Sequence, residues 1–316
     1  TLASVGVASA PAAQAAALLS DADVALYEAK NQGRGRVVAL ASGGRQAGAA
    51  ERSIGEQLLE ALERDAFVPA FQPQFDARTG ACVGVEAFAR WLRPDGAAPP
   101  AAFLEAAESL ELLAEIDRRI FAASVAQCLA LRARGAPAPT LSVNVSRARL
   151  VSDGFAADVR AAVAEGLPLV FEVSEAFGVD AARDDETVFA IERIRALGAV
   201  CAVDGYGAGP VSAVGLLKIR PDRLKIDRRL TAAVADCSVR RALAGSVVAA
   251  GRALGAGVGA AGVETLAQAR ALRDLGCDVL QGFAFAPPVA GSDLERTLRA
   301  RDWPRIDAPP AAAGGG

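Results

Sequence analysis

The sequence contains no histidine and no methionine. Without histidine, the chain cannot use an imidazole acid or base, a Ser-His-Asp triad or a histidine metal ligand. The lack of methionine in a chain that begins at Thr1 predicts a piece of a longer protein. The five cysteines are widely spaced without a C-x-x-C pair, which favours buried thiols in a reducing cytoplasm over disulfides or a zinc site.

Lysine and asparagine are scarce. Lys30, Lys218 and Lys225 are the only lysines among 34 basic residues, and asparagine occurs only at Asn31 and Asn144. In a chain that carries its positive charge as arginine, a lysine on a strand indicates a use for a compact, titratable ammonium. Chance retention is the alternative for Lys225, and it fits Lys218 better because that residue lies on a loop–helix segment.

No uninterrupted apolar run approaches the roughly 18 residues that span a bilayer, so no membrane segment is expected. A net charge of -3 provides no basic surface for DNA or RNA. The first 20 residues lack the positive leader of a signal peptide. These features predict a cytoplasmic protein, with an upstream membrane anchor left open, and 52% hydrophobic residues are ample for a large core.

Apolar strands alternate with amphipathic helices from Phe67 to about Ala300. This pattern is typical of a parallel sheet covered by helices. About eight such units, without an early G-x-G-x-x-G loop, favour a (β/α)8 TIM-like barrel over a Rossmann fold. We expect strands at 67–72, 82–91, 140–144, 169–173, 200–204, 223–227, 257–261 and 279–282, and helices at 54–63, 116–134, 155–165, 186–197, 239–254 and 266–275.

Polar residues stand near the carboxyl ends of six of these strands. In a barrel these ends ring one mouth, so groups that are distant in sequence converge there. Carboxylate and amide oxygens suit Mg²⁺ or Mn²⁺, which commonly hold and polarise a phosphate. The alternative is a set of ordinary strand-end polar residues. The residues concerned are Glu86, Asn144, Glu172, Asp204, Lys225 with Asp227, and Gln281.

The stretch from Ala199 to Asp227 carries the strongest single signal. An apolar strand ends in Asp204 and opens into a glycine-rich loop, and a second strand carries Lys225. A strand that ends in a carboxylate before a loop places a functional group at the rim of a sheet. A purely structural strand–loop–helix turn is the alternative reading of the same spacing.

This stretch, DGYGAG followed by LKID, resembles the DDFGTG and KID segments of EAL domains, the cyclic-di-GMP phosphodiesterase family. Other segments resemble family motifs in the family's order: FQPQFDARTGACVGVEAFARW, LSVNVS, FEVSE and QGFAFAPP. The resemblance covers nearly all of residues 53–300. It implies a barrel with an α/β fold, a site at its mouth, and cyclic-di-GMP as the ligand.

The resemblance also implies roles for individual residues. The metal ligands would be Glu86, Asn144, Glu172 and Asp204. Lys225 falls on the catalytic lysine, and Glu175 falls on the glutamate that steadies the loop after Asp204. The residues implied to contact the nucleotide are Gln72, Arg90, Asn144, Asp227 and Gln281.

Two departures from the family pattern concern one metal ion. Gly205 stands where the family has its second aspartate, and Ala261 stands where it has the first glutamate of AEGVE. Family enzymes are taken to use two ions, and both missing ligands would serve the second, so one Mg²⁺ or Mn²⁺ is expected. Asp222 and Glu264 are candidate replacement carboxylates. Pro210, in place of an aromatic, puts coupling of the loop to a dimer partner in doubt.

Three functions follow from these departures. The first is a degenerate EAL domain that binds cyclic-di-GMP, or a partner protein, with little or no hydrolysis. The second is an active phosphodiesterase that produces linear pGpG. The third is a scaffold that no longer binds nucleotide, which Phe88 in place of the family leucine would support. A homodimer and the identity of a protein partner are left open.

Residues 1–40 resemble the end of a different domain. DADVALYEAKNQGRGRVV is similar to the closing helix and strand of GGDEF diguanylate cyclase domains, whose signature would lie upstream. This segment is therefore expected to make no cyclic-di-GMP. Residues 41–52 have the composition of a flexible linker, 53–300 would form the EAL domain, and 301–316 would be a disordered tail.

Overall fold

The computed structural model describes residues 5–9, 37–41, 54–136, 139–174, 185–207, 213–300, 303–304 and 306. The chain divides into two compact units, Thr1–Arg64 and Asp65–Gly316. In the first unit, β1 (Val5–Ser9) pairs in parallel with β2 (Val37–Ala41), and α2 (Ile54–Glu63) follows. The helix expected before residue 33, most of the linker and most of the tail lie outside the described residues. The boundary between units falls after α2, whereas the domain boundary predicted from composition lies before it.

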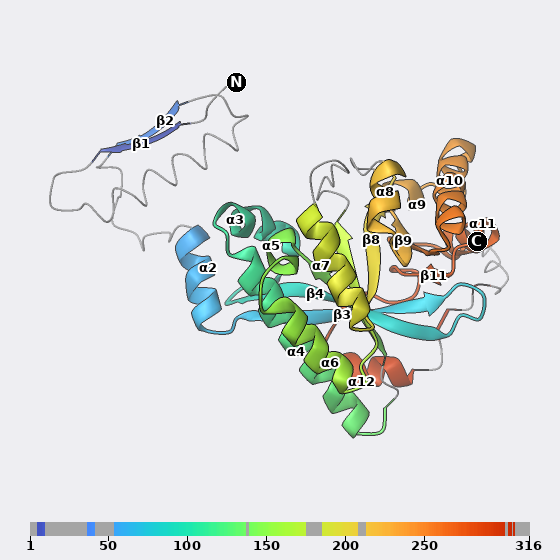
Figure 1. Ribbon diagram of the computed structural model, residues 1–316, viewed down its shortest axis with the longest axis horizontal. Coiled ribbons are helices and arrows are strands. Elements are labelled where there is room, and N and C mark those ends of the chain that lie inside the picture. Colours follow the sequence, from blue (N-terminus) through green and yellow to red (C-terminus); the bar gives the residue numbers. More distant parts are fainter. Residues whose placement is uncertain are drawn as a thin grey trace, which may run out of the picture. The chain divides into compact units, whose positions relative to one another are not determined.

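In the described part of the second unit, eight strands form a closed barrel (Figure 1). Their order around the barrel is β3-β11-β10-β9-β8-β7-β6-β4, and pairing of β3 with β4 closes it. The short strands β5 (Gly96–Ala98) and β12 (Val289–Ala290) add to β4 and β3. The barrel strands are β3 (Phe67–Asp76), β4 (Cys82–Arg93), β6 (Thr140–Val145), β7 (Leu169–Ser174), β8 (Val200–Tyr206), β9 (Arg223–Ile226), β10 (Gly257–Ala260) and β11 (Val279–Leu280).

The predicted barrel is confirmed, but one strand runs against the others. β3 is antiparallel to both of its barrel neighbours, β4 and β11. The reason is the connection from β3 to β4, which is a tight turn and leaves no room for the crossover that a parallel pair needs. In this turn the Asp76 carboxylate accepts hydrogen bonds from the backbone N–H groups of Arg78 and Thr79, at 3.0 and 2.6 Å. Gly80 then adopts a left-handed φ of 70°.

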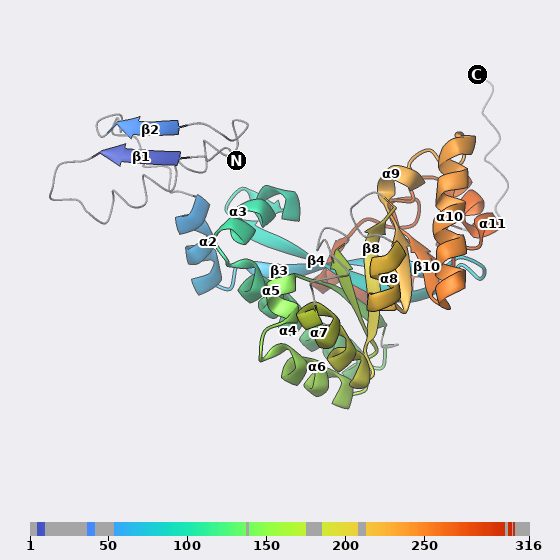
Figure 2. The same ribbon diagram turned by 45° about the horizontal axis from the view of Figure 1, so that its top comes forward.

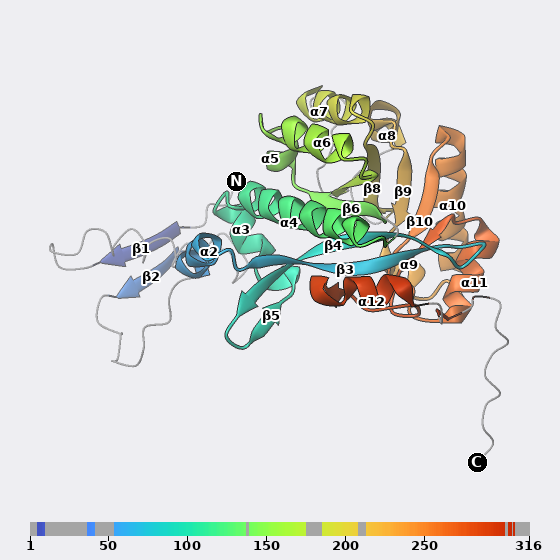
Figure 3. The same ribbon diagram turned by 90° about the horizontal axis from the view of Figure 1, so that it is seen from below.

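Helices cover the outside of the barrel (Figure 2). Figure 3 shows α12 lying along β3, against which it packs. None of the described helices is long and apolar enough to cross a membrane. The helices of this unit are η1 (Pro100–Ala102), α3 (Leu104–Ser109), α4 (Leu113–Ala133), α5 (Arg147–Leu150), α6 (Phe155–Ala164), α7 (Asp185–Ala196), α8 (Ala213–Ile219), α9 (Arg228–Thr231), α10 (Ser238–Leu254), α11 (Leu266–Leu275) and α12 (Gly291–Arg299).

The hydrophobic core lies between the strands and these helices. Phe121 of α4, Phe155 of α6 and Phe171 of β7 meet there, with ring centroids 4.9 to 6.4 Å apart. Burial of each such ring contributes about 1.5–3 kcal/mol. Successive side chains of a strand point to opposite faces, so the outward positions are apolar and the alternate positions face the barrel lumen. On β7, for example, Phe171 and Val173 face the helices and Glu172 faces inward.

Candidate functional site

Lys225 on β9 lies at the centre of a cluster of acidic side chains. Its Nζ donates hydrogen bonds to Glu86 Oε2 at 2.6 Å and to Glu172 Oε2 at 2.5 Å, and it lies 3.8 Å from Asp204 Oδ1. Asn144 Nδ2 donates to Glu86 Oε1 at 2.9 Å. These residues come from five neighbouring strands, so the barrel brings together the lysine and all four predicted metal ligands. We refer to them below as the lysine–carboxylate cluster.

The cluster has more negative than positive charge. Glu86 and Glu172 are 1% and 2% exposed and Lys225 is 8% exposed, so water screens these charges little. Burial is the main cause that raises the pKa of Glu172 well above its usual value, and the neighbouring Glu86 carboxylate adds to this effect. Burial likewise raises the pKa of Asp204. A single ammonium cannot balance the buried carboxylates of Glu86 and Glu172 together with the half-buried carboxylate of Asp204. Among the three, Glu172 is the group that retains a proton most readily.

The pKa values of Glu86 and Lys225 move the other way. Burial opposes ionisation of Glu86, but Lys225 and the hydrogen bonds from Asn144 and Gln281 outweigh it and lower the pKa of Glu86. Burial also disfavours the Lys225 ammonium, yet Glu172 and Glu86 outweigh that effect and raise its pKa well above the usual value. Lys225 is therefore protonated at neutral pH and can donate hydrogen bonds but cannot accept a proton.

The chemistry of the cluster fits a hard divalent cation, although its present geometry does not. In the described ranges, no three acidic or cysteine side chains form a group ready to hold a metal ion, because the Lys225 ammonium stands between Glu86 and Glu172. The donors are carboxylate and amide oxygens, as Mg²⁺ and Mn²⁺ prefer. The excess negative charge is what such an ion would neutralise. The ligand roles of Glu86, Asn144, Glu172 and Asp204 stay a prediction.

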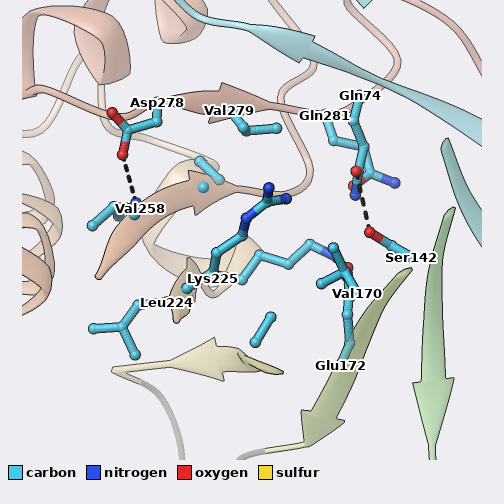
Figure 4. A pocket seen from close by; sticks show the side chains of 15 residues that line it. Gln74, Ser142, Val170, Glu172, Leu224, Lys225, Val258, Asp278, Val279 and Gln281 are labelled. Atoms are coloured by element: carbon cyan, nitrogen blue, oxygen red, sulfur yellow. Dashed lines mark hydrogen bonds and ion pairs between the residues drawn. The ribbon is translucent and has the colours of Figure 1, made fainter. Parts of the chain in front are cut away.

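A chain of buried amides lies beside the cluster. Gln281 Nε2 donates to Gln72 Oε1 at 3.1 Å, and Gln72 Nε2 donates to the carbonyl oxygen of Ala286 at 2.9 Å. Gln74 Nε2 donates to Gln281 Oε1 at 3.1 Å, and the Ser142 hydroxyl donates to Gln74 Oε1 at 3.3 Å. Figure 4 shows Gln74, Gln281 and Ser142 on one wall. The sequence predicted Gln72 and Gln281 but missed Gln74, which the alternation along β3 places on the same inward face.

The other two predicted nucleotide contacts, Arg90 and Asp227, are held by local interactions. Arg90 is half-buried on β4, and its Nη1 donates to the carbonyl oxygen of Ala89 at 2.8 Å. Its guanidinium lies 5.9 Å from the centre of the Phe88 ring. Asp227 caps α9, where Oδ1 accepts from the backbone N–H and the Nε of Arg229, at 2.7 and 2.8 Å. Burial of Asp227 raises the pKa of its carboxyl group, but the hydrogen bonds and charge of Arg229 outweigh this effect and lower the pKa below its usual value.

The two positions that depart from the family pattern provide no side-chain oxygen. Gly205 follows Asp204 on β8 with a left-handed φ of 76°, and a side chain there would begin 3.6 Å from Asp227 Oδ2. Ala261 directly follows β10 and is half-buried.

The two candidate replacement carboxylates lie at opposite ends of the barrel strands. Asp222 precedes β9, and its carboxylate accepts from the Cys201 N–H at 2.9 Å and from Arg195 Nη2 at 2.8 Å. It therefore lies at the opposite end of β9 from Asp227. Glu264 is exposed. Glu175 and Pro210 lie outside the described residues, so their predicted roles stay predictions.

The fold and the cluster together define an α/β barrel with an acidic, lysine-containing site at the carboxyl ends of its strands. Residues 55–288 match the EAL domain family, and the chain belongs to that family, as its motifs predicted. EAL phosphodiesterases in general depend on divalent metal ions, in agreement with the acidic donors found here.

Two curated bacterial proteins are similar to this chain. The chain is 32% identical over 283 residues to the bifunctional diguanylate cyclase/cyclic di-GMP phosphodiesterase MucR of Pseudomonas aeruginosa. The aligned region covers 88% of this chain and 41% of MucR. The chain is 30% identical over 249 residues to the oxygen sensor protein DosP of Escherichia coli, covering 76% of this chain and 30% of DosP. This chain thus spans less than half the length of these curated relatives.

Solved structures agree with the fold. The c-di-GMP complex of the PaMucR phosphodiesterase is 32% identical, with a TM-score of 0.70, over 77% of this chain and 100% of that one. The EAL domain of Xanthomonas citri FimX in complex with c-diGMP is 25% identical, with a TM-score of 0.66, over 74% of this chain and 92% of that one.

Proposed function

We propose that this chain binds cyclic-di-GMP at the mouth of its barrel and hydrolyses it little or not at all, so that it acts as a receptor or regulatory module. One observation carries the proposal: the lysine–carboxylate cluster is complete, while Gly205 and Ala261 beside it offer no ligand for a second ion. The names of the relatives MucR and FimX, which include a cyclic-di-GMP phosphodiesterase and complexes with c-di-GMP, support the choice of ligand.

Binding would use groups that the structure holds ready. Gln72 and Gln281 present amide groups that are positioned by their hydrogen bond to each other. Arg90 offers a guanidinium, which suits a phosphate because it can donate two parallel hydrogen bonds. Its place against the Phe88 ring restricts its motion and lowers the entropy lost on binding. Phe88 therefore supports an arginine that could serve a nucleotide, which weakens the scaffold alternative.

Glu86, Asn144, Glu172 and Asp204 would hold a single Mg²⁺ or Mn²⁺. When bound, that ion would neutralise the carboxylates and hold a phosphate oxygen. Lys225 would have to leave its place between Glu86 and Glu172, and its ammonium could then face negative charge that develops on the phosphate. Because Lys225 stays protonated and the chain has no histidine, only a carboxylate of the cluster could take a proton from water.

Slow hydrolysis is expected because a second metal ion contributes a large part of the rate. Hydrolysis with two ions stabilises both the entering and the leaving oxygen. Loss of a single preorganised oxyanion donor typically lowers the rate by about 10²–10³. Loss of a whole ion should cost at least as much. An active phosphodiesterase that yields linear pGpG is the second candidate, and the retention of Lys225 and of every ligand of the first ion favours it.

Two measurements test the proposal. Calorimetry with cyclic-di-GMP in Mg²⁺ or Mn²⁺ should show saturable binding, and Arg90→Gln should weaken it, whereas the exposed control Arg160→Gln should not. Chromatography of the same mixture should show conversion to pGpG at least about 10²-fold slower than by the MucR phosphodiesterase assayed alongside. Rapid pGpG production would refute the receptor function, and absence of binding at high micromolar nucleotide would favour a scaffold.

A further inference from the structure

The lumen of the barrel contains a cavity of about 240 Å³ that adjoins the lysine–carboxylate cluster at Glu172 and Lys225. Figure 4 shows side chains that line this cavity. Glu172, Lys225 and Gln281 line the cavity at the end nearer the mouth of the barrel. Arg223, Gly257 and Asp278 line it at the amino-terminal ends of β9, β10 and β11. The cavity therefore extends from the cluster toward the face of the barrel opposite the mouth.

The cavity exists because the inward residues at this level are small. Bulky branched side chains normally fill the lumen of a barrel of this type. Here β6, β8 and β10 contribute Ser142, Ala202 and Gly259 to the lining. Val170 and Val279 supply the larger apolar walls. These choices leave space where a packed layer of side chains is usual.

The backbone does not require the two glycines of β10. Neither Gly257 nor Gly259 has a left-handed φ. A Cβ on Gly259 would lie 3.5 Å from the carbonyl oxygen of Val279, and one on Gly257 would lie 3.5 Å from Asp278 Oδ2, both ordinary contacts. Glycine inside a strand lowers stability and often marks a place where another molecule approaches closely. The glycines are therefore best explained by the open space that they preserve.

The lining includes two acidic and two basic side chains, and one of the basic ones, Arg223, is suited to a small anion. Lys225 is paired with Glu86 and Glu172, and Asp278 Oδ2 accepts from the backbone N–H of Val258 at 2.7 Å. Arg223 is half-buried and makes no hydrogen bond or ion pair with any residue that the structure describes. The lining thus contains a guanidinium without an acidic partner beside apolar walls. Exposure of Asp278, and partial exposure of Gly257, gives the cavity access to solvent from the amino-terminal face.

We propose that this cavity is a second binding site, which takes a small monocarboxylate. The carboxylate would pair with the Arg223 guanidinium through two parallel hydrogen bonds. The apolar body of the ligand would lie against Val170, Ala202 and Val279. The volume corresponds to several water molecules at about 30 Å³ each, which is room for a compact ring or a short branched chain. This site is separate from nucleotide binding at the mouth and does not depend on it.

Benzoate is a suitable probe, and its binding to the whole chain can be followed by ligand-observed NMR without any nucleotide. Saturable binding is expected below about 10 mM, a range typical of weak fragments. Arg223→Gln should weaken binding about tenfold or more, since hydrogen bonds to charged groups are the stronger kind. Benzamide, which has the same shape without the charge, should bind about tenfold more weakly than benzoate to the unchanged protein.

Variants of the lumen separate this site from the mouth. Gly259→Val should abolish benzoate binding because its side chain fills the cavity, and Arg160→Gln and Arg90→Gln should leave it unchanged. If Gly259→Val fails to fold by circular dichroism, Gly257→Ala with Gly259→Ala, which fit without a clash, should weaken binding at least about threefold by reducing the space. No saturation in the unchanged protein, undiminished binding in a folded lumen variant, or loss of binding in Arg90→Gln would each overturn the proposal.

Discussion

If the proposed function is right, carboxylates introduced at Gly205 and Ala261 should raise the rate of cyclic-di-GMP hydrolysis. Gly205→Asp with Ala261→Glu would supply both missing ligands, and the rate of cyclic-di-GMP hydrolysis should rise about 10²–10³-fold in Mn²⁺. Each single variant supplies only half of the required pair. The hydrolysis rate of each single variant should therefore remain within about tenfold of the rate of the unchanged protein. The effect of the double variant should be far larger than the two single effects combined.

The structure also sets the effect of these changes on stability. At Gly205, a φ of 76° makes a non-glycine residue less stable by about 1–2 kcal/mol. The new Cβ would lie 3.6 Å from Asp227 Oδ2, an ordinary contact, so space is sufficient. Repulsion between the new carboxylate and Asp227 adds on the order of 1 kcal/mol, reduced by the Arg229 guanidinium on Asp227. Without metal, the melting temperature should thus fall by about 4–12 °C, at about 2–4 °C per kcal/mol for a domain of this size.

Chromatographic detection of pGpG, with and without EDTA, checks the rate. Thermal unfolding with and without Mn²⁺ checks whether the ion restores stability to the double variant. The matched control is Gly205→Asn with Ala261→Gln, which has the same side-chain shapes without charge and should stay inactive. The reasoning is refuted if the double variant is folded and stabilised by Mn²⁺ but still hydrolyses the nucleotide at the rate of the unchanged protein.

Three further perturbations test individual contacts. Lys225→Met leaves Glu86 and Glu172 buried without a cation, so the free energy of unfolding in urea should fall by about 3–5 kcal/mol. The fall should be smaller in Mn²⁺ or at low pH. An unchanged midpoint of urea unfolding would contradict the ion pairs of Lys225 with the two glutamates. Asp117 of α4 accepts a hydrogen bond from the backbone N–H of Ser146 at 2.7 Å, but burial outweighs this contact and raises the pKa of Asp117 from 3.8 to about 6. Since the folded pKa exceeds the unfolded one, the contribution of Asp117 to stability should fall by about 3 kcal/mol as pH rises from about 3 to about 7, and this fall should be absent in Asp117→Asn. Gln281→Leu removes the partner of Gln72 and Gln74, so calorimetry should show cyclic-di-GMP binding weakened about tenfold or more. The control Glu192→Leu, at an exposed position of α7, should bind the nucleotide normally.

The strands could be predicted from sequence because buried strands form continuous apolar runs. The run at 140–144 became β6, and the run at 169–173 became β7, each with one added residue. The direction of β3 could not be read in this way, since the composition of a strand is the same in both directions. The turn after Asp76 did contain the information, because so short a connection permits only an antiparallel pair.

The site was predicted in part for the same reason. Strand ends converge in a barrel, so Glu86, Glu172, Asp204 and Lys225 were expected together, and they are together. That Lys225 bonds two carboxylates at once depends on side-chain reach across the lumen, which spacing does not encode. Gln74 was missed because the expected strand ended at residue 72, whereas β3 continues to Asp76 and so carries Gln74 on the same face as Gln72.

The position of Lys225 has a consequence for how the protein responds to its surroundings. Because the ammonium already bridges β4 and β7, the barrel carries an internal counter-ion and need not lose its shape when magnesium is scarce. Any ion that enters must compete with a tethered amine at an effectively constant local concentration. Such a competitor lowers the apparent affinity for the ion by a constant factor, so a higher free concentration of the ion would be needed to displace Lys225 from the two glutamates.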